Sequence, residues 1–234
     1  MNGVVQINDK DGTVENCYYL SDSETDDFDG TTFKTADQFA SGEVCYLLNG
    51  DQSAIAFYQD LSSEKYPTLN ADSEQVCRLE MTYDESFGED AATVTTYHNT
   101  GAKITLATAK ADSDCWDSSQ ISKTNRTFYG WSANTDANDK DVPVADTMDR
   151  ATLDANAETQ ITMPARAKTV YALWAINPTL TYNVNAPATT KAPDAPASIT
   201  VPYNTAADDK SGWTVGDTGK ITGYSFDGWH TSPT

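Results

Sequence analysis

Short stretches in which apolar and polar residues alternate recur along most of the chain, and this pattern predicts β-strands. Turn-forming residues separate them, among them Asn99-Thr100-Gly101, which predicts a hairpin between its two flanking strands. The strands are expected at 4–7, 14–20, 94–97 and 103–107. The chain is therefore expected to be mainly β.

One segment has helical spacing instead. Thr35 and Gln38 fit a capping box, apolar positions follow through Leu48, and Asn49-Gly50 predicts the end of the helix. Gly42 weakens its middle. The stretch 54–58 suggests a strand or a short helix, and 66–69 an edge strand or an extended segment. The N-terminal third therefore predicts a compact α+β module.

The later part of the chain contains one motif twice. Phe128-Tyr129-Gly130-Trp131 matches Phe226-Asp227-Gly228-Trp229, and each follows a second matched pair, Met81-Thr82-Tyr83-Asp84 and Leu180-Thr181-Tyr182-Asn183. The Tyr-to-Trp spacing is 48 residues from Tyr83 to Trp131 and 47 from Tyr182 to Trp229. A near-constant interval between matched motifs predicts a folding unit that occurs twice.

The net charge and the aromatic content of the chain limit which partners it can bind and indicate that it folds. The 234 residues include 35 acidic and 15 basic side chains, for a formal net charge of −20. Such a field repels phosphate backbones and anionic lipids, so we expect neither nucleic acid nor a membrane as a direct partner. Aromatic residues make up 10% of the chain, which is enough apolar area to favour a folded protein.

The N-terminal third resembles a known family segment. The blocks 12–20, 34–44, 46–49 and 66–69, in this order, are similar to the segment that closes arrays of GLUG-type repeats in large surface proteins of anaerobic gut bacteria. The resemblance covers about residues 3–72. It implies that the first strands form the last rung of a parallel β-solenoid and that the helix caps its open end.

The remainder resembles the Listeria–Bacteroides repeat, also called the internalin B-type B repeat. The residues that carry the resemblance are Thr127 to Trp131, Ile161-Thr162-Met163-Pro164, Thr169 to Trp174 and Gly223 to Trp229. The resemblance implies small β-grasp-like units in tandem on exported Gram-positive proteins. The first copy departs from the family at Asp84-Glu85-Ser86-Phe87-Gly88, where an Asn-Gly-Gly turn is usual, and its stretch 108–123 is long.

These resemblances predict three domains, a capping module at 1–78 and two repeats at 79–176 and 177–234. The second repeat stops at Thr234, five residues after Trp229, whereas the first continues through Trp174. A unit without its last strand would leave an open sheet edge. We therefore expect the second repeat to be incomplete and the natural protein to continue.

The tryptophans are the main candidate functional residues. Trp131, Trp174 and Trp229 are interpreted as core anchors, with Gly130 and Gly228 before two of them to let a neighbouring backbone approach closely. Stacking on sugars is the alternative role for these rings. Trp116 and Trp213 lie in intervening loops and are the better candidates for exposed, ligand-binding aromatic residues.

The cysteines are few and widely spaced, so a disulfide scaffold or a paired zinc site is not expected. Cys17 and Cys45 are interpreted as small buried apolar residues, with a disulfide as the alternative. Their spacing leaves any pairing open. The four are Cys17, Cys45, Cys77 and Cys115.

Signs of catalysis and of cofactors are weak. The chain has two histidines, His98 and His230, and no Ser or Cys lies in a local nucleophile motif, which leaves a Ser/His/Asp triad assembled from distant residues as the alternative. The chain has no phosphate loop or dinucleotide fingerprint. The acidic stretches 22–30 and 134–141 place oxygen ligands at alternate positions, so Ca²⁺ is the one cofactor to weigh. Neither completes a twelve-residue calcium loop, which favours solvated acidic loops and no cofactor.

Together these features predict a non-catalytic, extracellular segment of a multidomain bacterial cell-surface or secreted protein. It would act as a stalk or spacer beside neighbouring domains of the same chain and as an adhesion module for host or glycan ligands. The alternative is a carbohydrate-binding accessory region of a secreted glycan-degrading enzyme. An exposed aromatic groove around Trp116 or Trp213 would favour that alternative.

Overall fold

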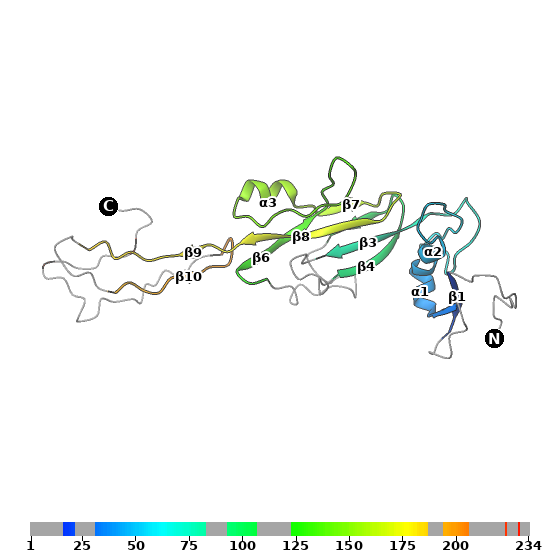
Figure 1. Cartoon of the computed structure of the whole chain (residues 1–234), viewed down its shortest axis with the longest axis horizontal. Helices are drawn as coiled ribbons and strands as arrows, with labels where there is room; N and C mark the ends of the chain where they lie inside the picture. Colours follow the sequence, from blue (N-terminus) through cyan, green and yellow to red (C-terminus); the bar gives the residue numbers. More distant parts are fainter. Residues whose placement is uncertain are drawn as a thin grey trace.

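A computed structural model describes residues 16–21, 31–82, 93–106, 123–186 and 194–205, together with Gly223 and Trp229. This described part of the chain is mainly β, as the alternating pattern predicts, with three short helices. Its elements follow one another along the longest axis, with β1 (Cys17–Leu20) near one end and β9 (Thr179–Leu180) with β10 (Ile199–Thr200) toward the other (Figure 1).

The described residues up to Gln75 form an N-terminal module. Strand β1 pairs in parallel with β2 (Thr31–Lys34), and the chain then enters α1 (Ala36–Ala40). Thr35 caps this helix: its hydroxyl accepts from the Gln38 backbone N–H, and the Gln38 side chain accepts from the Thr35 N–H. The predicted capping box is therefore confirmed. Of the first predicted pair of strands, the described part contains only β1.

The predicted single helix is wrong, because it is broken at Gly42. A second helix, α2 (Glu43–Leu48), starts there after Gly42 adopts a left-handed φ of 88°. A side chain at this position would place its Cβ 2.8 Å from Leu61 Cδ2 and 2.9 Å from Val76 Cγ1. Glycine thus serves a sharp turn and a close approach at once.

The stretch 54–58 forms neither the strand nor the short helix that its composition suggests. Instead, a single antiparallel bridge joins Tyr58 to Thr68. The buried Asn49 side chain orders this part of the module, because it accepts from the backbone N–H groups of Ala56 and Phe57 and donates to the Phe57 carbonyl. Side-chain amides here satisfy backbone groups that a regular element would pair.

The first unit, Val76–Ile176, is built on a mixed four-stranded sheet in the order β4-β3-β8-β6. Its first strand, β3, and its last strand, β8, are parallel neighbours at the centre, with an antiparallel strand on each side. Strand β3 runs across the boundary expected after residue 78. The strands are β3 (Val76–Thr82), β4 (Thr93–Asn99), β6 (Arg126–Ser132) and β8 (Lys168–Ile176).

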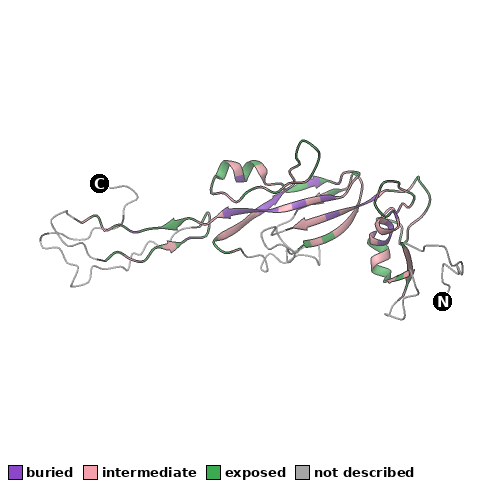
Figure 2. Cartoon of the chain, viewed as in Figure 1, coloured by how far each residue is buried: buried purple, intermediate pink, exposed green. Residues whose placement is uncertain are grey.

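Strand β8 is buried on both faces, as Figure 2 shows by its run of buried residues. Val170, Ala172 and Trp174 face a core shared with a two-stranded ribbon of β5 (Lys103–Thr105) and β7 (Gln160–Thr162). Leu173 and Ala175 face α3 (Arg150–Asn156) through Leu153. The sheet therefore lies between a ribbon and a helix, and the period of two along β8 assigns its residues to the two layers.

The hairpin predicted at Asn99-Thr100-Gly101 does not form. Strand β4 pairs with β3, whereas β5 pairs with β7, so the two predicted strands exist but lie in different sheets. Gly101 adopts φ 81° and donates its N–H to the Met163 carbonyl at 2.8 Å, which turns the chain toward β7. The turn is present, but it changes sheets instead of closing a hairpin.

The second unit begins after Asn177. Its strands β9 and β10 pair antiparallel, with Leu180 opposite Ile199. In the first unit Met81, which matches Leu180 in sequence, lies opposite Val94 in the antiparallel pair of β3 and β4. The matched positions of the two copies thus occupy the same place in an antiparallel strand pair.

Candidate functional site

The aromatic motif owes its spacing to a bulge in β6. Phe128 lies opposite Trp174 and Trp131 opposite Ala172, with one extra residue of β6 between them, because the register shifts between Phe128 and Gly130. A regular strand would send residues three apart to opposite faces, and the bulge brings both rings to the same face. The Phe128 ring meets Trp131 and Trp174 edge-on, with centroids 5.6 and 5.8 Å away.

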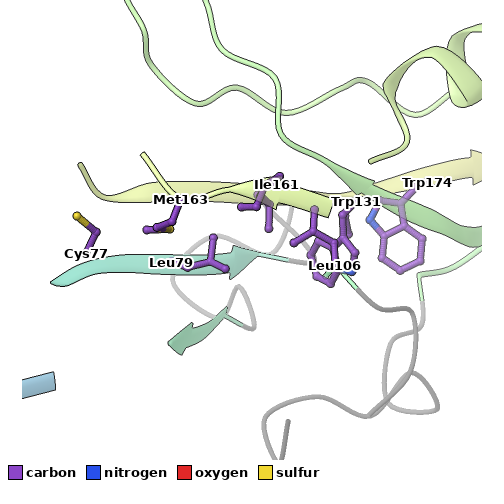
Figure 3. Close-up of a cluster of buried hydrophobic side chains, with 9 residues drawn as sticks. Cys77, Leu79, Leu106, Trp131, Ile161, Met163 and Trp174 are labelled. Carbon is purple, nitrogen blue, oxygen red and sulfur yellow. The ribbon is translucent and has the colours of Figure 1, made fainter. Parts of the chain in front are cut away.

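Trp131 and Trp174 are buried in the core of the first unit, with 0% and 4% of their surface exposed, as the sequence predicts. In Figure 3 they lie with Leu106 at one end of a row of core side chains that runs along the sheet to Met163 and Cys77. Neither ring offers a face to a sugar. The proposed stacking role is therefore wrong for these two residues.

The prediction that Gly130 allows close approach of a neighbouring backbone is wrong. A Cβ built on Gly130 would meet only the Ala157 Cβ, at 3.8 Å, which is an ordinary van der Waals contact. Close approach of a neighbouring backbone thus does not require glycine here. Gly130 pairs with Leu173 directly after Tyr129, the residue that the bulge leaves unpaired, and its φ is not positive, so neither space nor backbone angle requires glycine here.

In the second unit the repeated tyrosine and tryptophan, Tyr182 and Trp229, are in contact. The Tyr182 ring, which is 8% exposed, lies 4.9 Å from the Trp229 ring, centroid to centroid. Trp229 itself is half-buried. The contact joins the two matched residues of the second copy, while Tyr83, their counterpart in the first copy, lies outside the described residues. Gly228, Trp116 and Trp213 lie outside the described residues, so the ligand-binding prediction for the last two stays a prediction.

Asparagine and tyrosine side chains join the N-terminal module to the first unit. Asn99, at the end of β4, donates to the Gln59 carbonyl at 2.7 Å and accepts from the Leu61 N–H at 2.9 Å. Beside it the rings of Tyr46 and Tyr97 pack with centroids 5.6 Å apart. Burial, the largest influence, raises the pKa of Tyr97 to about 12. We call this contact the first junction.

An asparagine and a tyrosine pair also join the first unit to the second. The Asn177 side-chain oxygen accepts from the Thr127 hydroxyl at 2.6 Å and from the backbone N–H of Tyr203 at 3.0 Å. The Tyr203 ring packs edge-on against Tyr129, with centroids 6.1 Å apart. We call this contact the second junction. One residue of the linker thus binds both units.

Helix α3 braces the second junction from the first unit. The Tyr129 hydroxyl donates to the Asp154 carboxylate, which also accepts from Arg150 Nε one helical turn away. The Arg150 guanidinium lies 5.5 Å from the centre of the Tyr129 ring. The hydrogen bonds from Tyr129 and Arg150 lower the pKa of Asp154, so it accepts as a carboxylate. Helix α3 of the first unit therefore fixes the position of the Tyr129 ring that packs against Tyr203.

The acidic loop 134–141 is tied to cations of the same chain. The Asp141 carboxylate accepts from Arg166, from Lys168 Nζ and from the backbone N–H of Thr169. Burial would raise the pKa of Asp141, but these hydrogen bonds outweigh it and lower that pKa. Asp139 also pairs with Arg166, at 2.8 Å.

Two of the oxygen ligands that suggested calcium are thus bound to arginine and lysine. Among the described residues no cluster of three or more His, Cys, Asp or Glu side chains could hold a metal ion. The other acidic stretch, 22–30, lies outside the described residues.

The remaining reactive side chains have structural surroundings. His98 Nε2 lies 2.8 Å from the Thr96 hydroxyl, and burial lowers the pKa of His98. Cys45 and Cys77 are buried thiols, and burial raises the pKa of Cys45 to about 12, which disfavours its reactive thiolate. Cys17 is half-buried in β1, while Cys115 and His230 lie outside the described part.

No helix among the described residues is long and apolar enough to cross a membrane.

Sequence reasoning missed the residues that build the junctions. The sequence pattern places Asn99 in a turn and gives no role to Asn177 or Tyr203. A usable signal exists at Asn177, since an Asn-Pro step directly after a long apolar strand indicates the end of one unit and the start of the next.

Comparison of the chain with protein-family models, with curated proteins and with solved structures finds no match.

Proposed function

We propose that this chain is a non-catalytic, extracellular segment of a multidomain bacterial cell-surface protein, in which successive units form a stiff spacer. The placement on a cell surface follows from the sequence resemblance to GLUG-type and Listeria–Bacteroides repeat proteins. Adhesion to host or glycan ligands remains a proposal that rests on that resemblance alone.

One observation carries the spacer proposal. Strands β3 and β8, the first and last of the first unit, are parallel neighbours. The chain therefore enters this unit at one end of the sheet and leaves it at the opposite end, which strings the parts along one axis (Figure 1). Antiparallel first and last strands would instead fold the array back on itself.

The two junctions support stiffness in addition to length. Each combines an asparagine side chain that bonds across the boundary with a pair of tyrosine rings that pack across it. Such contacts oppose the free rotation that a flexible linker would allow.

We further propose that each repeat is a β-grasp-like unit. In the first unit a β3–β4 pair, a connecting ribbon and a β6–β8 pair give a mixed sheet with its first and last strands at the centre. This strand order is the one expected of a β-grasp. The matched strand pair β9–β10 supports the same assignment for the second unit.

Small-angle X-ray scattering on matched variants tests the spacer proposal. Asn177→Leu removes the oxygen that accepts from Thr127 and Tyr203, whereas Asn177→Asp keeps an acceptor at the same place. We expect the wild type and Asn177→Asp to share one narrow set of dimensions, and Asn177→Leu to show a broader distribution of end-to-end distances. Equal, broad distributions for all three would contradict a stiff array.

A second measurement tests the cellular placement. Antibodies raised against this chain should label intact cells of its source, or its culture medium, without permeabilisation. Labelling that requires permeabilised cells would contradict the extracellular proposal while leaving the spacer geometry untouched.

A further inference from the structure

We infer that the first unit is built to carry tension along its length. The overlapping β3–β8 strand pair, which we call the joint, is loaded in shear when the two ends of the unit are pulled apart. The inference rests on the proposed function only in that a spacer between a cell and its target is pulled at both ends. The joint itself is defined by the residues of the first unit alone.

The register between the two strands fixes how a pull is transmitted. The C-terminal half of β3, Leu79–Thr82, pairs with the N-terminal half of β8, Lys168–Tyr171, over four residue pairs. From this overlap the chain leaves toward the N-terminal module through Val76 and toward the second unit through Ile176. A pull on the two ends therefore slides the overlapped strands past one another along their length.

Sliding loads the bonds of the overlap together. When two strands are peeled apart from one end, their hydrogen bonds break one after another, and each break needs only the small net free energy of a single bond. When the same strands are sheared, the bonds of all four pairs must yield at once. The activation barrier, which governs forced unfolding, is then higher.

Both strands of the joint are supported on their outer edges. Strand β4 pairs with β3 along all seven residues of each, and β6 pairs with β8 from Ile176 back to Tyr171. Strand β4 thus flanks the whole overlap, whereas β6 shares only Tyr171 with it and supports the rest of β8. The joint lies at the centre of the sheet with the β5–β7 ribbon against one face, whereas helix α3 packs on the later half of β8, at Leu173 and Ala175.

Side chains reinforce the overlap itself. Leu79 and Val170, which are 1% and 0% exposed, keep water away from its hydrogen bonds on the ribbon side. On the other face the Thr169 hydroxyl donates to Glu80, across the two strands, at 3.4 Å. Asp141 accepts from Lys168 and from the Thr169 N–H, which ties the start of β8 to the loop after β6. The first residues of β8 are thus fixed where shear would begin.

Single-molecule pulling on the full chain tests the inference by comparing shear of the β3–β8 pair with peeling of the neighbouring β6–β8 pair in the same fold. In the shear geometry, handles are attached through introduced azide-bearing residues at the exposed positions Glu74 and Thr179, on either side of the joint. In the peeling geometry they are attached at the exposed positions Thr124 and Thr179, which flank the paired ends of β6 and β8. The two labelled proteins share the handle at Thr179 and the same fold.

We expect the rupture force at equal loading rate to be roughly twofold or more higher in shear than in peeling, because four residue pairs yield together. The released length should be about 3.6 Å for each residue between the handles, which identifies the unit that opened. A shear force equal to or below the peeling force would overturn the inference. The scattering test of the spacer proposal would be unaffected, since stiffness at the junctions does not depend on the strength of the joint.

Discussion

Lys168 and Asp141 form an ion pair in which the two side chains are only 8% and 9% exposed. Lys168 reaches this position from the central strand β8, where its Nζ also donates to the Ala133 carbonyl at 2.7 Å. A buried ammonium and a buried carboxylate each carry a desolvation cost that only their mutual contact and further hydrogen bonds offset. The pair thus fixes the loop after β6 onto the start of β8.

Replacing Asp141 should therefore destabilise the first unit strongly. Asp141→Asn leaves the Lys168 ammonium buried without its counter-ion, which costs about 3–5 kcal/mol for pairs of this kind. Equilibrium urea unfolding measures the change. Asp139→Asn is the matched control, since Asp139 pairs with the same Arg166 but is 73% exposed, and we expect it to change stability little. Equal effects of the two substitutions would contradict the buried-pair account.

The pH dependence of stability should carry the signature of Asp141. Its folded pKa is lowered, because the hydrogen bonds from Arg166, Lys168 and the Thr169 backbone outweigh burial. The stabilisation is then fully present above the unfolded value of about 3.9 and is lost as the pH falls from there through the folded pKa.

Urea unfolding at a series of pH values checks this sign. The wild type should lose stability on acidification below about pH 4 more steeply than Asp141→Asn, which cannot take up that proton. Other carboxylates with lowered pKa values contribute to both proteins and cancel in the difference. Parallel curves for the two proteins would show that Asp141 does not titrate as described.

Two glycines with similar backbone angles should respond differently to alanine. Gly42 and Gly101 have φ of 88° and 81°, a region that costs an alanine roughly 1–2 kcal/mol. At Gly101 an added Cβ meets nothing within 4 Å, so Gly101→Ala should cost no more than that. At Gly42 the Cβ would lie 2.9 Å from the fully buried Val76, and overpacking adds about 1–3 kcal/mol.

Thermal unfolding followed by circular dichroism compares the two variants. Gly42→Ala should have the lower midpoint, with the loss in the N-terminal module and at the start of β3. If both variants melt alike, crowding at Gly42 is relieved by movement of Leu61 and Val76, and the tight turn does not constrain the module.

The parts of the fold that were predictable are those specified by neighbouring residues. The capping box of Thr35 and Gln38 is local chemistry, and it forms as predicted. Burial of Trp131 and Trp174 followed from large apolar rings in strand-like segments. The bulge that brings Phe128 and Trp131 to one face is already implied by their spacing, since a regular strand could not bury both rings in the same core.

Strand pairing was not predictable, because it depends on partners far along the chain. Asn99-Thr100-Gly101 has the composition of a hairpin turn, yet β4 pairs with the preceding strand β3 and β5 pairs with β7, beyond β6 and α3. Nothing in the turn residues distinguishes a hairpin from a change of sheet. The same holds for Lys168, whose partner Asp141 lies in a loop that precedes α3.

The buried tryptophan of the repeated motif should matter far more than an exposed aromatic residue of the same chain. Trp131→Ala removes a fully buried indole that packs against Phe128, and truncations of this kind cost about 3–5 kcal/mol. Tyr66→Ala is the control, because Tyr66 is 51% exposed and contacts Phe39 in the N-terminal module. Urea unfolding should show a large loss for Trp131→Ala and a small one for Tyr66→Ala. If Trp131→Ala also leaves stability unchanged, the indole is not an interior anchor, and its repetition along the chain would require a binding role instead.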